Sequence, residues 1–395
     1  MRRSLRLRSA TLAALLALLS GGLTAGADPS PRALPAAAKS TVPAFDLAGP
    51  AALPVAIRPD GEPGPLAPSV GAGPPTGPAA APAVAPPAAS AAVPTGPVAQ
   101  AGCPPPPRPP RSARAPGLPK GITLVPEDQV PAPLDPPTAR TTDASVLGGR
   151  GMWMWQWGRT EGGDLNAVVR RAKAAGLSTL WVRVGDSKSG FYGAGYLDRL
   201  VPLAHREGLK VVGWGFPFLG DPVGDAAWTG QVLAWQRDGH RLDAFSPDLE
   251  TASEGVVVTE KRLATYLGLA RQGLAGRPLV ATVYNPTDQW WTSYPYARVA
   301  AYADVLAPMV YWGCRDPGAD VQRAVSRLAT FGLPVVPAGQ SYNMASDGGR
   351  PGNPSGAETL RFLDQARRSG AAGAAFWVWQ ETSAEQWQAI SAYPW

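Results

Sequence analysis

The sequence predicts an α/β fold, a (β/α)8 TIM barrel, in the second part of a chain of 395 residues. All 14 tryptophans and all 10 tyrosines lie in residues 151–395, whereas residues 1–150 hold 31 of the 45 prolines and one aromatic residue, Phe45. Large side chains are needed to bury enough apolar surface to offset chain entropy, so a core can form only in the second part. There, short apolar segments alternate with helical patterns, which predicts parallel strands joined by helices.

The first residues predict a secretory signal peptide over residues 1–27. Four arginines within the first eight residues precede an apolar segment from about Thr11 to Leu23, and small residues follow at Ala25 to Ala27. The apolar segment is shorter than the roughly 20 residues that a membrane-spanning helix needs. We therefore predict a secreted protein, extracellular or associated with the cell wall, without a membrane span after the signal is cleaved.

Residues 28–147 are predicted to form a disordered Pro/Ala/Gly-rich linker, followed by the barrel at 148–395. Alternating Ala and Pro and the run Pro104 to Pro107 favour extended polyproline II segments interrupted by Gly. Such a segment serves either as a spacer that holds the domain away from a surface or as a tail without a partner.

The charge of the predicted domain excludes a nucleic-acid partner. The whole chain has a formal net charge of +6, but residues 151–395 hold 23 Lys and Arg against 22 Asp and Glu, so no basic footprint is present. His205 and His240 stand apart in the sequence and are predicted to be structural or solvated. Neither they nor the two cysteines have the spacing of metal ligands, so no metal and no cofactor are predicted. Whether Cys103 and Cys314 form a disulfide is left open, as is the oligomeric state.

Eight apolar segments of strand length follow one another in the second part. They are Gly151 to Trp157, Thr179 to Val184, Lys210 to Phe216, Ala244 to Glu250, Leu279 to Asn285, Val305 to Trp312, Pro334 to Gln340 and Ala374 to Gln380. The helical patterns between them include Leu165 to Ala175, Leu197 to Glu207, Ala226 to Asp238, Glu260 to Leu274 and Ala357 to Ser369. An open doubly wound sheet is the alternative, but no glycine-rich phosphate loop follows the first strand.

The fourth predicted strand ends in a pair of carboxylates. In a barrel the chemistry lies at the carboxyl ends of the strands. Asp248 and Glu250 are two residues apart, so strand alternation places both side chains on one face, with Cα atoms roughly 7 Å apart. Repulsion between such close charges, in a setting of low polarity, raises the pKa of one of them and leaves it able to protonate a leaving oxygen. Glycoside hydrolysis requires such an acid. The alternative is a pair that braces loops.

The residues from Asp243 to Glu250 resemble the fourth-strand signature D-G-x-D-x-D-x-E of family 18 glycoside hydrolases, the chitinase-like barrels, at three of its four acidic positions. Asp304 to Trp312 is similar to the family's M-x-Y-D strand. The resemblance implies that Glu250 is the catalytic acid, that Asp248 orients an acetamido group of the substrate and that Tyr311 hydrogen-bonds this group. It also implies that Trp377 forms the floor of the pocket.

Two positions depart from the family pattern and bear on the substrate. Ser246 and Trp312 stand where the family has acidic residues, and lysozyme-type barrels acting on peptidoglycan also carry an Asp-x-Glu on the fourth strand. The reaction type is therefore better supported by the residues than the identity of the glycan is.

Further polar and aromatic residues at the strand ends are candidates for substrate binding. Indole rings stack on sugars, and carboxylates and amides hydrogen-bond to sugar hydroxyls. Most of the tryptophans that alternate along the first strand (Trp153, Trp155, Trp157) and the eighth (Trp377, Trp379) are predicted to fill space between the barrel and its helices. Trp290 and Trp291 are predicted in a loop, where binding residues concentrate. The candidates are Trp377, Trp157, Trp290, Trp291, Asn285, Gln340 and Asp186.

The sequence thus predicts a secreted glycoside hydrolase-like enzyme that cleaves O-glycosidic bonds in an N-acetyl amino-sugar polymer, chitin-like or peptidoglycan. Two alternatives remain. One is a carbohydrate-binding barrel without catalysis, and the other is an interaction module of the cell wall.

Overall fold

The computed structural model describes residues 117–140 and 143–395. The predicted signal peptide, most of the predicted linker and Cys103 lie outside the described residues. In the described part of the chain, no helix has both the length and the apolar character needed to cross a membrane.

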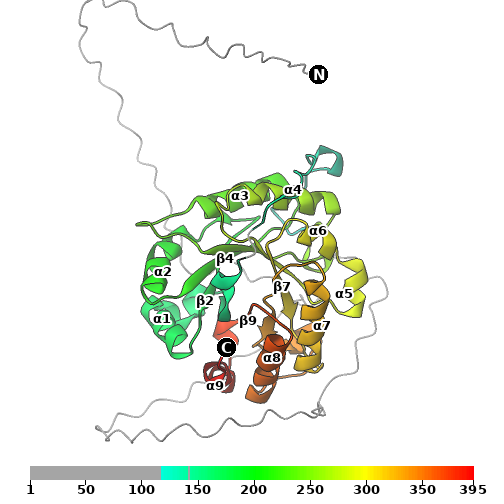
Figure 1. The fold of residues 1–395 in the computed structure, drawn as a ribbon. Helices are drawn as coiled ribbons and strands as arrows, with labels where there is room; N and C mark the ends of the chain where they lie inside the picture. Colours follow the sequence, from blue (N-terminus) through cyan, green and yellow to red (C-terminus); the bar gives the residue numbers. More distant parts are fainter. Residues whose placement is uncertain (1–116, 141–142) are drawn as a thin grey trace, which may run out of the picture. The chain divides into compact units, whose positions relative to one another are not determined.

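Eight parallel strands form a barrel, which confirms the predicted fold class (Figure 1). They follow the order β5-β4-β2-β1-β9-β8-β7-β6, and the barrel closes where single bridges join Phe245 to Leu279 and Asp248 to Thr282. A short strand, β3 (Gly190–Phe191), pairs antiparallel with β2. The barrel strands are β1 (Gly149–Met154), β2 (Thr179–Asp186), β4 (Lys210–Phe216), β5 (Ala244–Pro247), β6 (Val280–Tyr284), β7 (Val305–Val310), β8 (Ala338–Gln340) and β9 (Gly373–Trp377).

Helices cover the outside of the barrel (Figure 1). Several begin at side chains that accept hydrogen bonds from the first free backbone N–H groups, such as Asp164 before α1 and Ser355 before α8, where Glu358 completes a capping box. The helices are α1 (Leu165–Ala174), α2 (Ala194–Arg206), α3 (Pro222–Ala234), α4 (Glu260–Arg271), α5 (Asp288–Ser293), α6 (Tyr296–Ala300), α7 (Pro317–Ala329), α8 (Gly356–Arg368) and α9 (Ala384–Ala392).

Three tryptophans fill the inside of the barrel. Trp153 stacks on Trp181 with ring centroids 4.6 Å apart and lies 5.4 Å from the ring of Trp214, and all three are buried. The prediction that most tryptophans of the first and eighth strands fill the space between barrel and helices is wrong for Trp153. Alternation along β1 turns Trp153 inward and sends Met152 and Met154 to the layer under the helices.

Residues 117–140 pack against the barrel, and we call this segment the N-terminal strap. Its Val130 is 2% exposed, and the buried guanidinium of Arg262 on α4 binds the Glu127 carboxylate at 2.6 Å and the Val125 carbonyl. The hydroxyl of Tyr302 donates to the Leu134 carbonyl at 2.7 Å. The strap lies within residues 28–147, which the sequence predicts as linker, and its bonds to Arg262 and Tyr302 hold it against the barrel.

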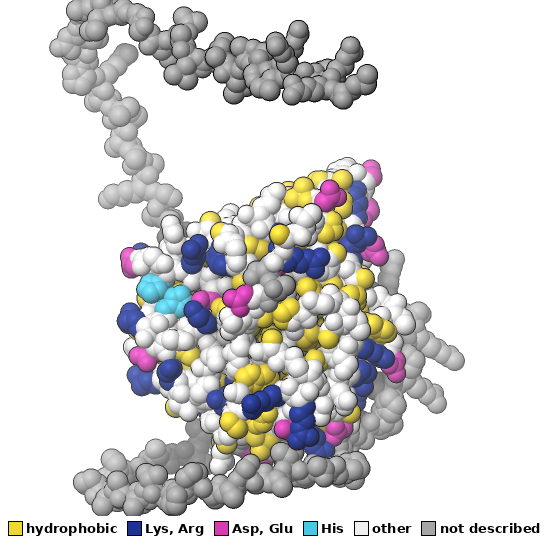
Figure 2. Space-filling view, in the orientation of Figure 1, with side chains coloured by type: hydrophobic (Ala, Val, Ile, Leu, Met, Phe, Trp, Pro, Cys, Tyr) yellow, Lys and Arg dark blue, Asp and Glu magenta, His cyan; other side chains and the backbone are white. Residues whose placement is uncertain are grey.

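The two histidines meet at the surface, although they stand apart in the sequence (Figure 2). Their Nδ1 atoms are 2.9 Å apart, and the Nε2 atom of His205 lies 2.9 Å from the carboxylate of Asp243. Asp243 also accepts the backbone N–H of Val211. Through Asp243 the two histidines are connected to the backbone of β4, so their contacts are structural ones.

Cys314, in the loop after β7, is disulfide-bonded. Cys103, the other cysteine of the chain, lies outside the described residues.

Candidate active site

A pocket of about 120 Å³ lies at the carboxyl ends of the barrel strands. Six of the eight strands or the residues that directly follow them contribute to it. Its lining consists of Trp153, Phe216, Asp248, Glu250, Glu254, Thr282, Met309, Tyr311 and Trp377. Three of these side chains are carboxylic acids. Two of them, Asp248 and Glu250, are the pair that the sequence predicts at the end of the fourth barrel strand.

The backbone after β5 remains extended as far as the carboxylates. The N–H of Asp248 donates to the Gly215 carbonyl at 2.9 Å, and the N–H of Leu249 donates to the Thr282 carbonyl at 3.0 Å. Strand alternation therefore continues: Leu249 is fully buried in the outer core, while Asp248 and Glu250 both line the pocket. This local geometry brings the two carboxylates to one face.

Burial raises the pKa of both carboxyl groups. Asp248 is 6% exposed, and its pKa is raised by burial and by Glu254, against the opposing charge of Arg183. The pKa of Glu250 lies well above its ordinary value because of burial and because Asp248 and Glu254 repel its charge. A hydrogen bond from Tyr284 acts in the opposite direction. Both carboxyl groups therefore keep their protons to higher pH than ordinary carboxyl groups do.

Ser246 is occupied by the barrel wall. Its hydroxyl donates to the Val280 carbonyl at 2.7 Å and lies 2.7 Å from the hydroxyl of Thr282. Ser246 is fully buried beneath the pocket, so it stabilises the contact between β5 and β6. An additional carboxylate at this position would have to displace these bonds.

Tyr311 and Trp377 line the pocket from the side of the barrel opposite to β4 and β5. Burial, together with the neighbouring Tyr342, Asp248 and Glu250, raises the pKa of Tyr311 well above its ordinary value, so the hydroxyl keeps its proton and can donate it in a hydrogen bond. The ring of Trp377 contacts Trp153 and Trp214 edge-on, with centroids 5.9 and 5.4 Å away. The tryptophans inside the barrel thus form the floor on which Trp377 rests.

Trp312, where the family pattern has an acid, is fully buried against Phe362, with ring centroids 5.4 Å apart. It is a core residue behind the pocket wall.

Three predicted polar residues do not line the pocket. Asp186 forms an ion pair with Arg183 at 3.1 Å and accepts the N–H groups of the turn that follows β2. The amide of Asn285 donates to Asp320 at 3.1 Å. The amide of Gln340 bridges the backbone of Gly313 and Tyr342. Each is buried and bonds to groups outside the pocket, although the Oδ1 atom of Asn285 has no hydrogen-bond partner among the described residues.

The three other predicted tryptophans also lie outside the pocket. Trp157 follows β1 in a short 3-10 helix, stacks on Tyr196 at 4.4 Å and donates to the Arg183 carbonyl. Trp290 and Trp291 lie in the helix α5 and not in a loop. Trp290 packs on the ring of Tyr284 at 4.5 Å, which places it behind the tyrosine that bonds to Glu250.

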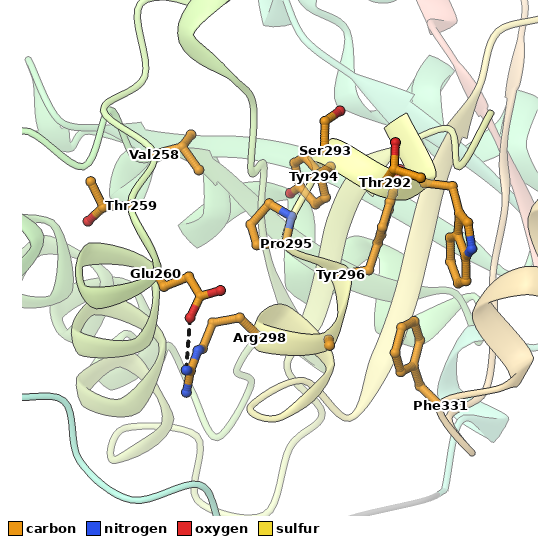
Figure 3. A pocket seen from close by; sticks show the side chains of 12 residues that line it. Val258, Thr259, Glu260, Thr292, Ser293, Tyr294, Pro295, Tyr296, Arg298 and Phe331 are labelled. Atoms are coloured by element: carbon orange, nitrogen blue, oxygen red, sulfur yellow. Dashed lines mark hydrogen bonds and ion pairs between the residues drawn. The ribbon is translucent and has the colours of Figure 1, made fainter. Parts of the chain in front are cut away.

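Trp291 lines a second, larger hollow of about 470 Å³ on the side of the barrel. In Figure 3 the ion pair between Glu260 and Arg298, 2.9 Å long, closes one end of this hollow, and Phe331 lies at the other end. The guanidinium of Arg327 lies 5.5 Å from the Trp291 ring centroid. This hollow contains none of the pocket carboxylates.

Sequence reasoning missed three residues that act on the pocket. Glu254 lines it from the 3-10 helix Ala252–Glu254, Tyr284 bonds to Glu250 from the end of β6, and Arg183 faces Asp248 from β2. Tyr284 and Arg183 lie at or near the ends of strands, so a list of all polar strand-end residues would have included them. Glu254 lies in the connection that follows β5, where no strand or helix periodicity in the sequence indicates which side chains point into the pocket.

Among the residues that the structure describes, no group of three or more His, Cys, Asp or Glu side chains is arranged to hold a metal ion.

Comparison with known proteins gives matches among solved structures. No family model matches the chain, and no curated protein matches it. It is similar to the chitinase from Chromobacterium violaceum ATCC 12472, with 11% identity and a TM-score of 0.48 over 62% of this chain and 100% of that one. It is also similar to a GH113 beta-1,4-mannanase, with 12% identity and a TM-score of 0.46 over 62% and 92%. A third match is the spore cortex-lytic enzyme SleL of Bacillus megaterium QM B1551, with 9% identity and a TM-score of 0.45 over 62% and 74%. The resemblance to chitinase-like and other glycoside hydrolase barrels is a distant one, of fold.

Proposed function

We propose that this protein is a glycoside hydrolase that cleaves O-glycosidic bonds in an amino-sugar polymer, with Glu250 as the general acid. The observation that carries the proposal is the pair of carboxyl groups in the pocket, the buried Asp248 and the partly buried Glu250, both with raised pKa values. An acid with a raised pKa is what the departing sugar oxygen requires as its bond to carbon breaks.

In the proposed reaction, the protonated carboxyl of Glu250 donates its proton to the glycosidic oxygen. The acetamido oxygen of the sugar whose glycosidic bond is cleaved attacks the anomeric carbon of that sugar, the bond from this carbon to the protonated glycosidic oxygen breaks, and the rest of the polymer leaves as an alcohol. Asp248 accepts a hydrogen bond from the acetamido N–H, and the Tyr311 hydroxyl donates one to the acetamido oxygen. The ionised Glu250 then takes a proton from the water molecule that attacks the anomeric carbon and releases the sugar.

One feature of Asp248 favours this role over that of a loop brace. Its Oδ1 atom is buried and has no hydrogen-bond partner among the described residues. A buried acceptor without a donor costs about 1–3 kcal/mol, which a ligand N–H would recover. A carboxylate that braces loops has its acceptors occupied, as Asp186 does.

Release of reducing ends tests the proposal. The mature protein is incubated with chitin oligomers, peptidoglycan and a neutral mannan. We expect turnover on N-acetylated substrates, and we expect Glu250→Gln to lower kcat by about 10²- to 10⁴-fold, the range for loss of a general acid. Glu207→Gln, which neutralises an exposed carboxylate at the end of α2, is the matched control and keeps wild-type activity.

Two results would contradict the proposal. If the wild type binds these glycans without cleaving them, the protein is a carbohydrate-binding barrel. If it neither binds nor cleaves any of them, the interaction-module hypothesis replaces the enzyme. We also propose an extracellular site of action, on the basis of the arginine-rich, apolar N-terminus of the chain.

A further inference from the structure

The three indole groups inside the barrel differ in how their N–H groups are bonded. The Nε1 atom of Trp181 donates to the Thr179 hydroxyl at 3.1 Å. The Nε1 atom of Trp214 donates to the Met154 carbonyl at 3.2 Å. The Nε1 atom of Trp153 is buried and has no acceptor among the described residues, and Trp153 is the member of the three that lines the pocket. The pocket therefore holds an unpaired hydrogen-bond donor.

The rings around Trp153 cannot supply the missing acceptor. They belong to Trp181, Trp214 and Trp377, with centroids 4.6, 5.4 and 5.9 Å away, and an indole N–H group is a donor only. A buried N–H group without an acceptor destabilises the state that contains it. Because Trp153 lines the pocket, an oxygen atom of a bound ligand can serve as the acceptor.

An unused acceptor lies in the same pocket, on Thr282. The hydroxyl of Ser246 donates its one proton to the Val280 carbonyl. In the contact of 2.7 Å between the hydroxyls of Ser246 and Thr282, the proton therefore comes from Thr282, whose oxygen keeps a lone pair for a further donor. Thr282 is 2% exposed and lines the pocket. A ligand group that accepts from Trp153 and donates to Thr282 is a hydroxyl.

Trp153 and Thr282 lie at the deep end of the pocket. They stand within β1 and β6, before the last residue of each strand. Asp248 and Tyr311 directly follow the ends of β5 and β7. In the proposed reaction these two residues bind the N–H and the carbonyl of the N-acyl group of the substrate, which leaves the terminal carbon of that group for the deep end. An acetyl group has a methyl there, which forms no hydrogen bond.

We propose that the N-acyl group of the preferred substrate is a glycolyl group, which differs from acetyl by one hydroxyl on the terminal carbon. This hydroxyl accepts the indole N–H of Trp153 and donates to the oxygen of Thr282. The two residues then determine the acyl specificity of the site. The identification of the ligand as an amino sugar rests on the proposed function, whereas the preference for a hydroxyl rests on the unpaired donor and the unused acceptor.

Binding measures this preference without requiring turnover. In Glu250→Gln protein, calorimetry compares the linear tetrasaccharides of N-glycolylglucosamine and of N-acetylglucosamine, which differ by one oxygen atom in each sugar. We expect the glycolyl tetramer to bind about tenfold more tightly, because the acetyl tetramer leaves a buried donor unpaired.

Variants of the two residues assign the preference to them. Trp153→Phe removes the donor, and Thr282→Val removes the acceptor while keeping the shape of the side chain. Each is expected to lower the preference to about twofold or less, with the affinity for the acetyl tetramer kept within about twofold. Trp181→Phe is the matched control and keeps the preference, since its N–H is bonded to Thr179 and it does not line the pocket.

Equal affinity for the two tetramers overturns the inference, as does a preference that survives in both the Trp153→Phe and the Thr282→Val protein. Loss of the preference to the same extent in Trp181→Phe also overturns it. Hydrolysis by the wild type is measured separately. Turnover of N-acetylated oligomers together with equal binding refutes this inference and leaves the proposed function standing. A preference for the glycolyl tetramer without turnover of either oligomer contradicts the proposed function and supports the acyl specificity.

Discussion

Glu250 is held between neighbours that act on its proton in opposite directions. Burial and the charges of Asp248 and Glu254 raise its pKa, and the hydrogen bond of Tyr284 lowers it. Tyr284 is itself positioned by Thr251 and Ser253, whose hydroxyls lie 3.3 and 3.2 Å from its own. Because Tyr284 bonds to Glu250 but does not itself line the pocket, we assign it as a positioning residue.

Tyr284→Phe tests this assignment. Loss of a hydrogen bond to the ionised carboxylate raises the pKa of Glu250 further, by about one unit for a bond of about 1.4 kcal/mol. The acid then stays protonated to higher pH, so we expect the alkaline limb of the kcat/KM profile to move upward in pH. A profile of kcat/KM against pH on an N-acetylated oligomer measures the shift.

Tyr296→Phe is the matched control, since the Tyr296 hydroxyl donates to the backbone carbonyl of Tyr284 at 3.1 Å and not to the acid. If both variants keep the wild-type alkaline limb, Tyr284 does not tune Glu250.

At the scale of elements, the N-terminal strap completes α4. Arg262 is 2% exposed, and its guanidinium bonds to the carbonyls of Leu219 and Gly220 as well as to Glu127 and Val125 of the strap. A buried guanidinium needs acceptors for its N–H groups, since an unpaired buried charge is costly. The proline-rich composition of this segment predicts a linker. Its contacts with the barrel hold it in place.

Removal of the strap is expected to destabilise the barrel. We compare chains that begin at residue 117 and at residue 141, so that both lack everything before the strap. The shorter chain loses the Glu127 and Val125 partners of Arg262 and the burial of Val130. We expect its free energy of unfolding to be lower by about 2–4 kcal/mol, since half of Glu127 is exposed to solvent.

Urea denaturation measures this difference. In the chain that begins at residue 117, Glu127→Gln isolates the ion pair and is expected to show part of the loss. Equal midpoints for the two chains would mean that the strap adds nothing to the stability of the barrel.

At the scale of the whole molecule, burial raises the pKa of some carboxyl groups, while hydrogen bonds and ion pairs lower the pKa of others. Burial raises the pKa of Asp225 to about 6, and burial also raises those of Asp248 and Glu250. A carboxyl group with a raised pKa keeps a proton in the folded state that the unfolded chain releases, so the protein loses stability as the pH rises through that interval. Groups such as Asp316, with lowered pKa, lose their contribution as the pH falls.

Asp225→Asn tests the raised pKa of a buried carboxyl group outside the active site. Asp225 is 2% exposed and accepts hydrogen bonds from Ser187, Trp228 and Leu219. Between pH 4 and pH 7 the wild type is expected to lose about 3 kcal/mol from this group, at about 1.4 kcal/mol per pKa unit. The asparagine does not ionise, so its curve of unfolding free energy against pH is flatter by this amount, although its absolute stability is lower. Parallel curves for the two proteins, measured by urea denaturation at each pH, would contradict a raised pKa at Asp225.

The sequence by itself determined the strands, their order and the pair of carboxylates on one face. Strand alternation and the spacing of Asp248 and Glu250 are local properties, and β4 from Lys210 to Phe216 has the predicted bounds. The predicted residues Asp248, Glu250, Tyr311 and Trp377 lie together in the pocket for the same reason, since parallel strands end at one face.

Only the tertiary structure decided which loop residues join them and which strand-end residues turn away. Glu254 joins the pocket because the chain after β5 returns to its opening, and no local pattern in the sequence records that approach. Gln340 turns away because its amide bonds to the backbone of Gly313 and Tyr342, and the amide N–H of Asn285 donates to Asp320 of α7. Such contacts depend on the closure of the barrel, which joins residues far apart in the chain and is therefore invisible to any short window of the sequence.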